Sequence, residues 1–218
     1  MPLTIITLRK GDEMHTGSVL NKYRKYDYEQ ATHCMVCDLA DSKRKNEDLL
    51  YRRLDDTQDC LYIQSKKPLD PRRVSDMGYD AQIVDIDSLL HALSCGDTVK
   101  ILAKLAPTIC VNGKKRSIDD PKKRIDWVHR KMAENGMTSI HVYEGNREYI
   151  NFSHYHQEHT IDQEKRANRK QTPFILGVNY TIIATISDVN AFSNAVHKGI
   201  GRGKAYGCGL LLFRKIEN

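Results

Sequence analysis

The sequence predicts an α+β protein of two tandem ferredoxin-like domains, each with the element order β-α-β-β-α-β. Its 218 residues suffice for two domains of roughly 100 residues each. The first half of the chain follows this order of strands and helices, and the second half repeats it less clearly. We therefore expect an N-terminal domain over residues 1–106 and a C-terminal domain over residues 107–218, joined near residues 106–113.

In the first half, runs rich in β-branched, aromatic and aliphatic residues indicate four strands. These expected strands are 3–8 (LTIITL), 49–54 (LLYRRL), 60–64 (CLYIQ) and 97–105 (DTVKILAKL). A helix is expected from about Tyr28 to Ala40. A second helix, over residues 87–96, ends at Gly96 because glycine commonly terminates helices.

In the second half, Asp120 followed by Pro121 marks a helix start, since aspartate caps helices and proline suits the first helical position. Residues 178–186 alternate between apolar and polar side chains, which is typical of a half-buried strand. A short helix capped at Asp188 then leads to Gly199, and CGLLLF (208–213) reads as a final buried strand. The apolar residues expected to face the core from the two helices are Ile125, Val128 and Met132, and Val189, Phe192 and Val196.

Composition narrows the class of protein. The net charge is +6. Hydrophobic residues make up 40% of the chain, so two domains can form ordinary hydrophobic cores without stabilisation by disulfides or metal ions. The six cysteines fit reduced thiols better than a disulfide framework. No apolar stretch is long enough to span a bilayer, and the first residues lack the layout of a signal peptide. We expect a cytoplasmic protein without a membrane partner.

The stretch HKGIGRGKAYGCG (197–209) has four glycines within the nine residues 199–207. A dinucleotide fingerprint or a Walker A loop needs a strand before the glycines and a helix after them, and here the expected order is the reverse. Two interpretations remain: a helix-ending glycine followed by a flexible turn, or a backbone cradle for phosphates. In the cradle, main-chain N–H groups would bind phosphate oxygens together with Arg202 and Lys204.

These residues carry a resemblance to a known family. GIGRGKAYGCGLL closely resembles the C-terminal glycine-rich signature of the CRISPR repeat-processing endoribonucleases, specifically the CasE type of the type I-E Cascade complex. The resemblance covers most of the chain, and the loop is its most specific part. Four further blocks resemble the family in the right order: LTIITL, His33 with the following DLLYRRLD, GDTVKILAKLAP and KKRIDWVHRKM.

The resemblance implies a CRISPR repeat hairpin RNA as substrate and cleavage without a metal or other cofactor. It also implies that the enzyme stays on its product as a Cascade subunit. This sequence departs from the family in the long insertion at residues 11–27. It also has Gln30 where the family often has a tyrosine, three positions before its histidine. The alternative function is therefore a repeat-RNA-binding subunit of the same complex that has lost the chemistry.

Cleavage by 2′-hydroxyl attack needs a proton acceptor and a proton donor, and histidine suits both roles near neutral pH. On a helix through residues 31–39, Ala31, Met35 and Leu39 share one side, so His33 should lie opposite and reach the surface. Periodicity alone also allows an idle surface histidine. The resemblance matches His33 to the family's catalytic histidine, with Tyr28 as second candidate for an orienting or proton-relaying role.

Two patterns could suggest a metal site. Cys34 and Cys37 form a CxxC pair, but a zinc site would want a second pair that the sequence lacks, so two small buried thiols are expected. The alternate histidines of residues 154–159 could bind zinc from one strand face, yet no further ligand is evident. We predict no metal site. Asp85, before an expected helix, reads as its cap.

Positive charge is clustered, as binding to a polyanion requires. One cluster is Lys114, Lys115 and Arg116, with Lys122, Lys123 and Arg124 just beyond; the other is Lys165, Arg166, Arg169 and Lys170. Simple solvated charge is the alternative for both. Because the family often presents a basic hairpin or helix at the second position, we expect residues 165–170 to contact the RNA stem. The expected RNA contacts of the glycine-rich stretch are Gly199, Gly201, Arg202, Gly203 and Lys204.

Overall fold

The computed structural model describes residues 1–8, 28–41, 49–53, 60–151 and 174–217. The first domain holds one four-stranded antiparallel sheet in the order β2-β3-β1-β4. The helices α2 and α3 complete the order β-α-β-β-α-β. Its elements are β1 (Pro2–Leu8), α2 (Tyr28–Leu39), β2 (Leu50–Arg53), β3 (Cys60–Gln64), α3 (Pro71–Asp76) and β4 (Tyr79–Asp85).

The second domain repeats this arrangement, with the strand order β10-β5-β9-β8. In both sheets the first strand of the domain lies between the fourth and the third, and the second strand lies at the edge. The prediction of two tandem ferredoxin-like domains is thus confirmed. The elements are β5 (Thr98–Leu105), α5 (Pro121–Ala133), β8 (Met137–Asn151), β9 (Phe174–Ile186), α7 (Val189–Lys198) and β10 (Leu211–Lys215).

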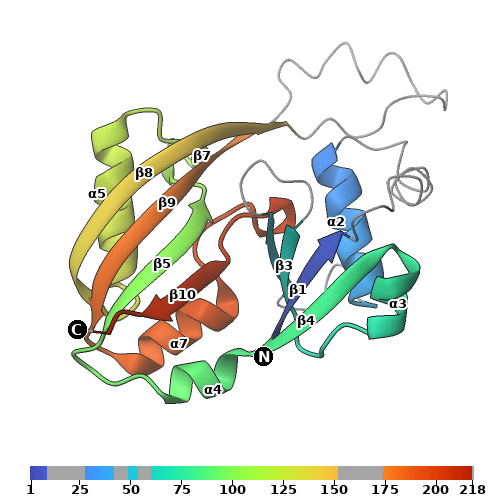
Figure 1. Cartoon of the computed structure of the whole chain (residues 1–218). Helices are drawn as coiled ribbons and strands as arrows, with labels where there is room; N and C mark the ends of the chain where they lie inside the picture. Colours follow the sequence, from blue (N-terminus) through green and yellow to red (C-terminus); the bar gives the residue numbers. More distant parts are fainter. Residues whose placement is uncertain (9–27, 42–48, 54–59, 152–173, 218) are drawn as a thin grey trace, which may run out of the picture.

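The strand expected to end the first domain belongs to the second. β5 pairs with β9 and β10, whereas the fourth strand of the first sheet is β4, which pairs with β1. The predicted boundary at residue 106 is therefore wrong, because β5 opens the second sheet. The helix expected over 87–96 is the shorter α4 (Ile86–His91), which follows β4 directly and connects the two sheets (Figure 1).

The core of the second domain lies between its sheet and the helices α5 and α7, which share one face of the sheet (Figure 1). Every second side chain of β5 points into this core, so the strand alternates between half-buried and buried residues. Asp120 and Asp188 cap the two helices, as expected, by accepting hydrogen bonds from Lys122 N and Ala191 N. Val128 and Met132 are buried as predicted, while Ile125 is only half-buried.

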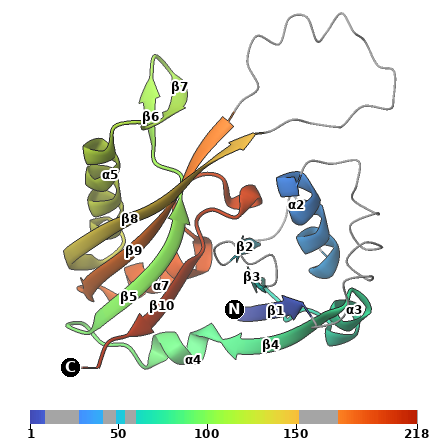
Figure 2. The same cartoon turned by 45° about the horizontal axis from the view of Figure 1, so that its top comes forward.

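The core of the first domain is smaller and lies between α2 and its sheet. Met35, Val36 and Leu39 of α2 pack against Ile6 and Ile63 of the central strands. One side of α2 is therefore apolar, as the sequence predicts. Figure 2 shows that the opposite side of α2 faces the second domain, where the single-turn helix η1 (Lys204–Tyr206) lies beside it.

A two-stranded hairpin projects from the second domain between β5 and α5. It consists of β6 (Thr108–Val111) and β7 (Lys114–Ser117), joined by Asn112 and Gly113, both with positive φ (50° and 73°). Asn-Gly with two positive φ angles is the preferred two-residue turn of a β-hairpin. Among the described residues, no helix is both long and apolar enough to cross a membrane.

Candidate functional site

His33 lies in α2 at the junction of the two domains, and it is buried. Its exposed fraction is 6%, so the expectation that it reaches the surface is wrong. The helical periodicity placed it correctly, on the side of α2 opposite Met35. His33 is not open to solvent, however, because Tyr51 of β2 and Tyr206 of η1 lie beside its ring. Helix periodicity identifies the side facing the domain's own core and contains no information about a second domain.

Two tyrosine rings flank the imidazole of His33. The ring centroids of Tyr51, from β2, and Tyr206, from η1, both lie 6.3 Å from that of His33, with interplanar angles of 30° and 36°. Cys37, one turn further along α2, places its Sγ 3.6 Å from Nε2 of His33. The imidazole thus has neighbours from both domains, and the environment that orients it exists only when the two domains are together.

A hydrogen bond fastens the glycine-rich stretch to the first domain. The hydroxyl of Tyr51, a buried residue, donates to the carbonyl oxygen of Ala205 over 2.7 Å. Ala205 is the middle residue of η1, directly before Tyr206. Because a buried hydroxyl without a partner is costly, this bond favours the position in which Tyr206 lies against His33.

The glycine-rich stretch folds back on itself between α7 and β10. The Ile200 amide donates to Gly209 O (2.9 Å), and the amides of Tyr206 and Cys208 both donate to Gly203 O (2.8 and 3.1 Å). The amide of Gly209 donates to Lys104 O of β5 (2.7 Å). The chain itself therefore binds these N–H groups, while Gly201 and Arg202 are exposed.

Internal packing explains why Gly199 must be a glycine. Gly199 ends α7 with φ 67° and ψ 161°, a backbone conformation that is essentially limited to glycine. A Cβ atom at this position would lie 2.8 Å from Gly209 O and 2.9 Å from the methyl groups of Leu50 in β2. Gly201 is less confined, because its nearest neighbour would be the Trp127 ring at 3.2 Å.

Charged side chains from both domains gather beside this junction. Arg53 of β2 donates from Nη2 to Thr32 Oγ1 over 2.9 Å, and Thr32 directly precedes His33. Lys104 of β5 forms an ion pair with Glu148 of β8. Burial lowers the pKa of the Arg53 guanidinium, an effect that the nearby Tyr79 and Glu148 partly oppose. The Arg53 guanidinium is therefore bound to the residue next to His33 in α2, in a partly desolvated place.

Comparison with known proteins identifies the family. The sequence matches the family of CRISPR-associated proteins over residues 4–215, nearly its whole length. The chain belongs to this family. A search of curated protein sequences finds no match.

Solved structures share the fold of this CRISPR-associated protein. One is Thermus thermophilus Cse3 bound to an RNA that represents a pre-cleavage complex, with a TM-score of 0.69, 18% identity and 98% of each chain covered. Another is Cas6e from Escherichia coli K-12, with a TM-score of 0.62, 17% identity and coverage of 99% of this chain and 100% of that one. A chain of a CRISPR RNA-guided surveillance complex matches with a TM-score of 0.63, 22% identity and the same coverage.

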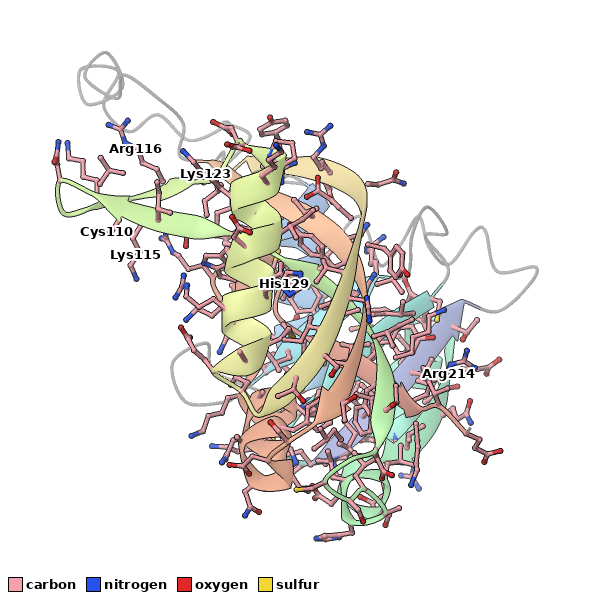
Figure 3. All side chains as sticks on the ribbon, turned by 90° about the vertical axis from the view of Figure 1, so that its left-hand side faces the viewer. Cys110, Lys115, Arg116, Lys123, His129 and Arg214 are labelled. Atoms are coloured by element: carbon pink, nitrogen blue, oxygen red, sulfur yellow. The ribbon has the colours of Figure 1, made fainter. Side chains whose placement is uncertain are left out.

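One of the two predicted basic clusters of this CRISPR-associated protein is exposed to solvent. Lys114, Lys115 and Arg116 are exposed on the β6–β7 hairpin, which extends beyond α5 into solvent (Figure 3). Lys122 and Lys123 are exposed at the start of α5, but Arg124 is fully buried. The other predicted cluster, Lys165, Arg166, Arg169 and Lys170, lies outside the described residues.

Arg124 has a structural role that the charge pattern did not reveal. Its guanidinium binds Glu144 of β8 through Nε and Nη2, over 3.0 and 2.6 Å, and Nη1 donates to Ile118 O over 3.3 Å. The bonds from Arg124 hold the pKa of Glu144 below its ordinary value. This ion pair anchors α5 to the second sheet and leaves Arg124 unable to reach an RNA.

The remaining predicted site residues have mixed outcomes. Tyr28 begins α2, but its side chain lies outside the described part of the structure, as do the histidines of residues 154–159. Cys34 and Cys37 are half-buried thiols rather than fully buried ones. Asp85 caps α4 as predicted, accepting a hydrogen bond from Asp87 N over 3.1 Å. The described ranges contain no group of three metal-binding side chains.

Sequence reasoning missed Tyr51, Tyr206, Thr32 and Arg53. Tyr206 stands within the glycine-rich signature and Tyr51 within DLLYRRLD, so both belong to the segments that carried the resemblance. That both tyrosines lie beside His33 could not be inferred from the sequence, because the three residues belong to three different elements. The contact between Tyr51 and Ala205 spans 154 positions of the chain.

Proposed function

We propose that this protein is a metal-independent endoribonuclease that binds a CRISPR repeat hairpin and cleaves precursor CRISPR RNA at the 3′ base of the hairpin. The observation that carries the proposal is the position of His33 at the domain junction, flanked by Tyr51 and by Tyr206 of the glycine-rich stretch. An imidazole can transfer protons near neutral pH, and the Arg53 guanidinium, bound to the adjacent Thr32, supplies positive charge; cleavage of a phosphodiester requires both. Membership of the CRISPR-associated family and the fold shared with Cse3 and Cas6e support this proposal.

His33 is the proposed proton-transfer group. In the reaction, the 2′-hydroxyl oxygen attacks the neighbouring phosphorus and the bond from phosphorus to the 5′-oxygen breaks. One proton leaves the 2′-hydroxyl and one is added to the departing oxygen. Histidine can serve in either transfer near neutral pH. Tyr28, at the first turn of the same helix, is the proposed partner that orients His33 or relays a proton.

Positive charge on the second domain is proposed to hold the RNA. The hairpin cluster Lys114, Lys115 and Arg116 is proposed to contact phosphates of a stem, and its exposure supports this role. The segment with Lys165, Arg166, Arg169 and Lys170 is proposed to bind the stem as well. The glycine-rich stretch is proposed to supply a third contact through Gly199, Gly201, Arg202, Gly203 and Lys204, of which Gly201 and Arg202 are exposed. Phosphate contacts dominate such binding, so affinity should fall steeply with salt.

The protein is proposed to remain on its product as a subunit of a Cascade-type complex in the cytoplasm. Structural likeness to a chain of an RNA-guided surveillance complex supports this partner assignment. The proposed partners are thus the repeat hairpin RNA, the mature CRISPR RNA and the neighbouring subunits of the complex.

Cleavage of a repeat RNA in the presence of EDTA tests the proposal. We expect one cut, leaving a 5′-hydroxyl and a 2′,3′-cyclic or 3′-phosphate. A substrate with a 2′-deoxy nucleotide upstream of the cut should bind with nearly unchanged affinity and stay intact, because it lacks the attacking hydroxyl. An absolute requirement for a divalent ion, or cleavage of the 2′-deoxy substrate, contradicts the mechanism.

A repeat-RNA-binding subunit without chemistry is the second candidate. Two observations favour it: His33 is 6% exposed, and Gln30 stands where the family often has a tyrosine. The same assay separates the two candidates. A protein without chemistry binds the hairpin with salt-dependent affinity and leaves it uncut under every condition.

A further inference from the structure

Strand β2 presents two side chains toward α2. Because side chains of a strand alternate between its two faces, Tyr51 and Arg53 share the face toward α2, while Leu50 and Arg52 share the other. The observed interactions agree with this division. The Tyr51 ring lies beside His33 and Arg53 donates to Thr32, whereas Arg52 reaches Asn179 of β9 (3.4 Å). The Arg53 guanidinium therefore lies on the same side of the strand as the imidazole.

The hydrogen bond with Thr32 fixes Arg53 near the proposed chemistry. Thr32 is a buried residue of α2, and its hydroxyl accepts a hydrogen bond from Nη2 at 2.9 Å. Thr32 directly precedes His33. The residue that binds the Arg53 guanidinium and the residue that carries the imidazole are therefore neighbours in α2. An arginine guanidinium carries several N–H donors in a planar fork, so a side chain that is anchored through one nitrogen can still bind a second acceptor.

The electrostatic environment of Arg53 favours an anionic ligand. Burial lowers the pKa of the guanidinium more than Tyr79 and Glu148 raise it, so desolvation dominates. Glu148 also pairs with Lys104, so its negative charge is shared between two cationic groups. A phosphate beside Arg53 would offset the desolvation with charge-assisted hydrogen bonds.

We propose that Arg53 is a further catalytic residue, whose guanidinium binds the non-bridging oxygens of the cleaved phosphate. The inference rests on the proposed function. As the bond from the 2′-oxygen to phosphorus forms and the bond to the 5′-oxygen breaks, negative charge develops on these oxygens. A preorganised donor in a desolvated place stabilises that charge more in the transition state than in the ground state. Thr32 is the positioning residue that holds Arg53 for this interaction.

Four variants test the assignment in single-turnover cleavage at saturating protein, where the rate does not depend on affinity. Arg53→Gln removes the charge, Arg53→Lys keeps it, and Thr32→Val removes the anchor. Arg73→Ala, on α3, is the control, because this arginine is exposed and pairs with Asp41. Affinity is measured separately with the uncleavable 2′-deoxy hairpin, and circular dichroism confirms the folding of each variant.

We expect Arg53→Gln to lower the single-turnover rate about 10²–10³-fold, the usual loss for one transition-state donor, with affinity changed only a few-fold. Arg53→Lys should recover part of the rate, and Thr32→Val should lower it by less than Arg53→Gln. Arg73→Ala should leave the rate unchanged. Added guanidinium, at a concentration that does not affect Arg73→Ala, should partly restore Arg53→Gln, which a merely structural role would not permit.

Three results overturn the inference. One is an Arg53→Gln variant that cuts at the wild-type rate. Another is an Arg53→Gln variant whose loss disappears at saturating protein, which would make Arg53 a binding residue. The last is a folded Arg53→Lys variant that is as inactive as Arg53→Gln, with no response of either variant to guanidinium. A wild-type protein that binds the hairpin and never cuts it refutes the proposed function and the inference with it, whereas the three results above leave the proposed function standing.

Discussion

Three glycine-to-alanine changes, two in the glycine-rich stretch and one reference change at Gly96, separate backbone strain from steric clash. Gly96, Gly201 and Gly199 all have positive φ angles, of 94°, 83° and 67°. A Cβ at Gly96 would meet nothing within 4 Å, so Gly96→Ala measures the cost of φ alone. We expect about 1 kcal/mol for it, since a left-handed conformation costs roughly 1–2 kcal/mol and alanine restricts the unfolded chain.

The other two changes add a clash to this cost. At Gly201 the new methyl group would lie 3.2 Å from the ring of Trp127, and at Gly199 it would lie 2.8 Å from a backbone oxygen. Overpacking costs roughly 1–3 kcal/mol and the backbone region of Gly199 a further 1–3, so Gly199→Ala should destabilise by about 3–5 kcal/mol. Gly201→Ala should fall between the other two.

Urea unfolding followed by circular dichroism measures the free energy of unfolding of each variant. The order of destabilisation should be Gly96→Ala, then Gly201→Ala, then Gly199→Ala. Equal losses for Gly96→Ala and Gly199→Ala would refute the conclusion that internal packing requires glycine at position 199. The phosphate-cradle interpretation alone would then have to explain this residue.

Two further predictions concern charge. Replacing Lys114, Lys115 and Arg116 together by alanine should weaken hairpin affinity and leave the single-turnover rate at saturating protein unchanged. The slope of log affinity against log salt concentration should become shallower by roughly 0.9 for each RNA phosphate that the protein no longer neutralises. A salt slope equal to that of the wild type means that the stem docks elsewhere. Arg124→Met should cost about 3–5 kcal/mol in unfolding free energy, because it leaves the Glu144 carboxylate unpaired. The depressed pKa of Glu144 stabilises the wild type fully above its unfolded-state pKa of about 4.3, and this contribution is lost as pH falls through the folded-state pKa. The variant should therefore lose less stability on acidification, as urea titrations at several pH values would reveal, and an unchanged pH dependence would contradict the role of the pair.

The strands that were predictable are those that cover a core on one face. β5 and the predicted part of β9 alternate regularly, because every second side chain packs into the core with α5 and α7. The range of β5 was predicted to within one residue, whereas β9 begins at Phe174 rather than at residue 178. β4 was missed because it is an edge strand whose side chains are mostly exposed, so no apolar alternation marks it. Alternation also carries no information about which sheet a strand joins, and this is why β5 was assigned to the wrong domain.

The candidate site was predictable only within single segments. The periodicity of α2 placed His33 opposite the core of the first domain, and the resemblance pointed to its chemistry. Its burial comes from Tyr51 and Tyr206, which approach from a different strand and from near the end of the chain. The buried Arg124 illustrates the same limit, because nothing in the run of Lys122, Lys123 and Arg124 distinguishes a solvated cation from one paired with Glu144.

The single-turnover cleavage rate of His33→Ala, compared with the affinity of this variant for the repeat hairpin, tests most directly whether His33 performs the proton transfer. A general acid or base contributes roughly 10²–10⁴-fold to a rate, so we predict a loss of this size. Affinity should stay within a few-fold of the wild type, because many phosphate contacts share the binding energy. Tyr28→Phe, measured alongside, should cost far less. A His33→Ala protein that cuts the hairpin at nearly the wild-type rate would contradict the assignment of the chemistry to this histidine.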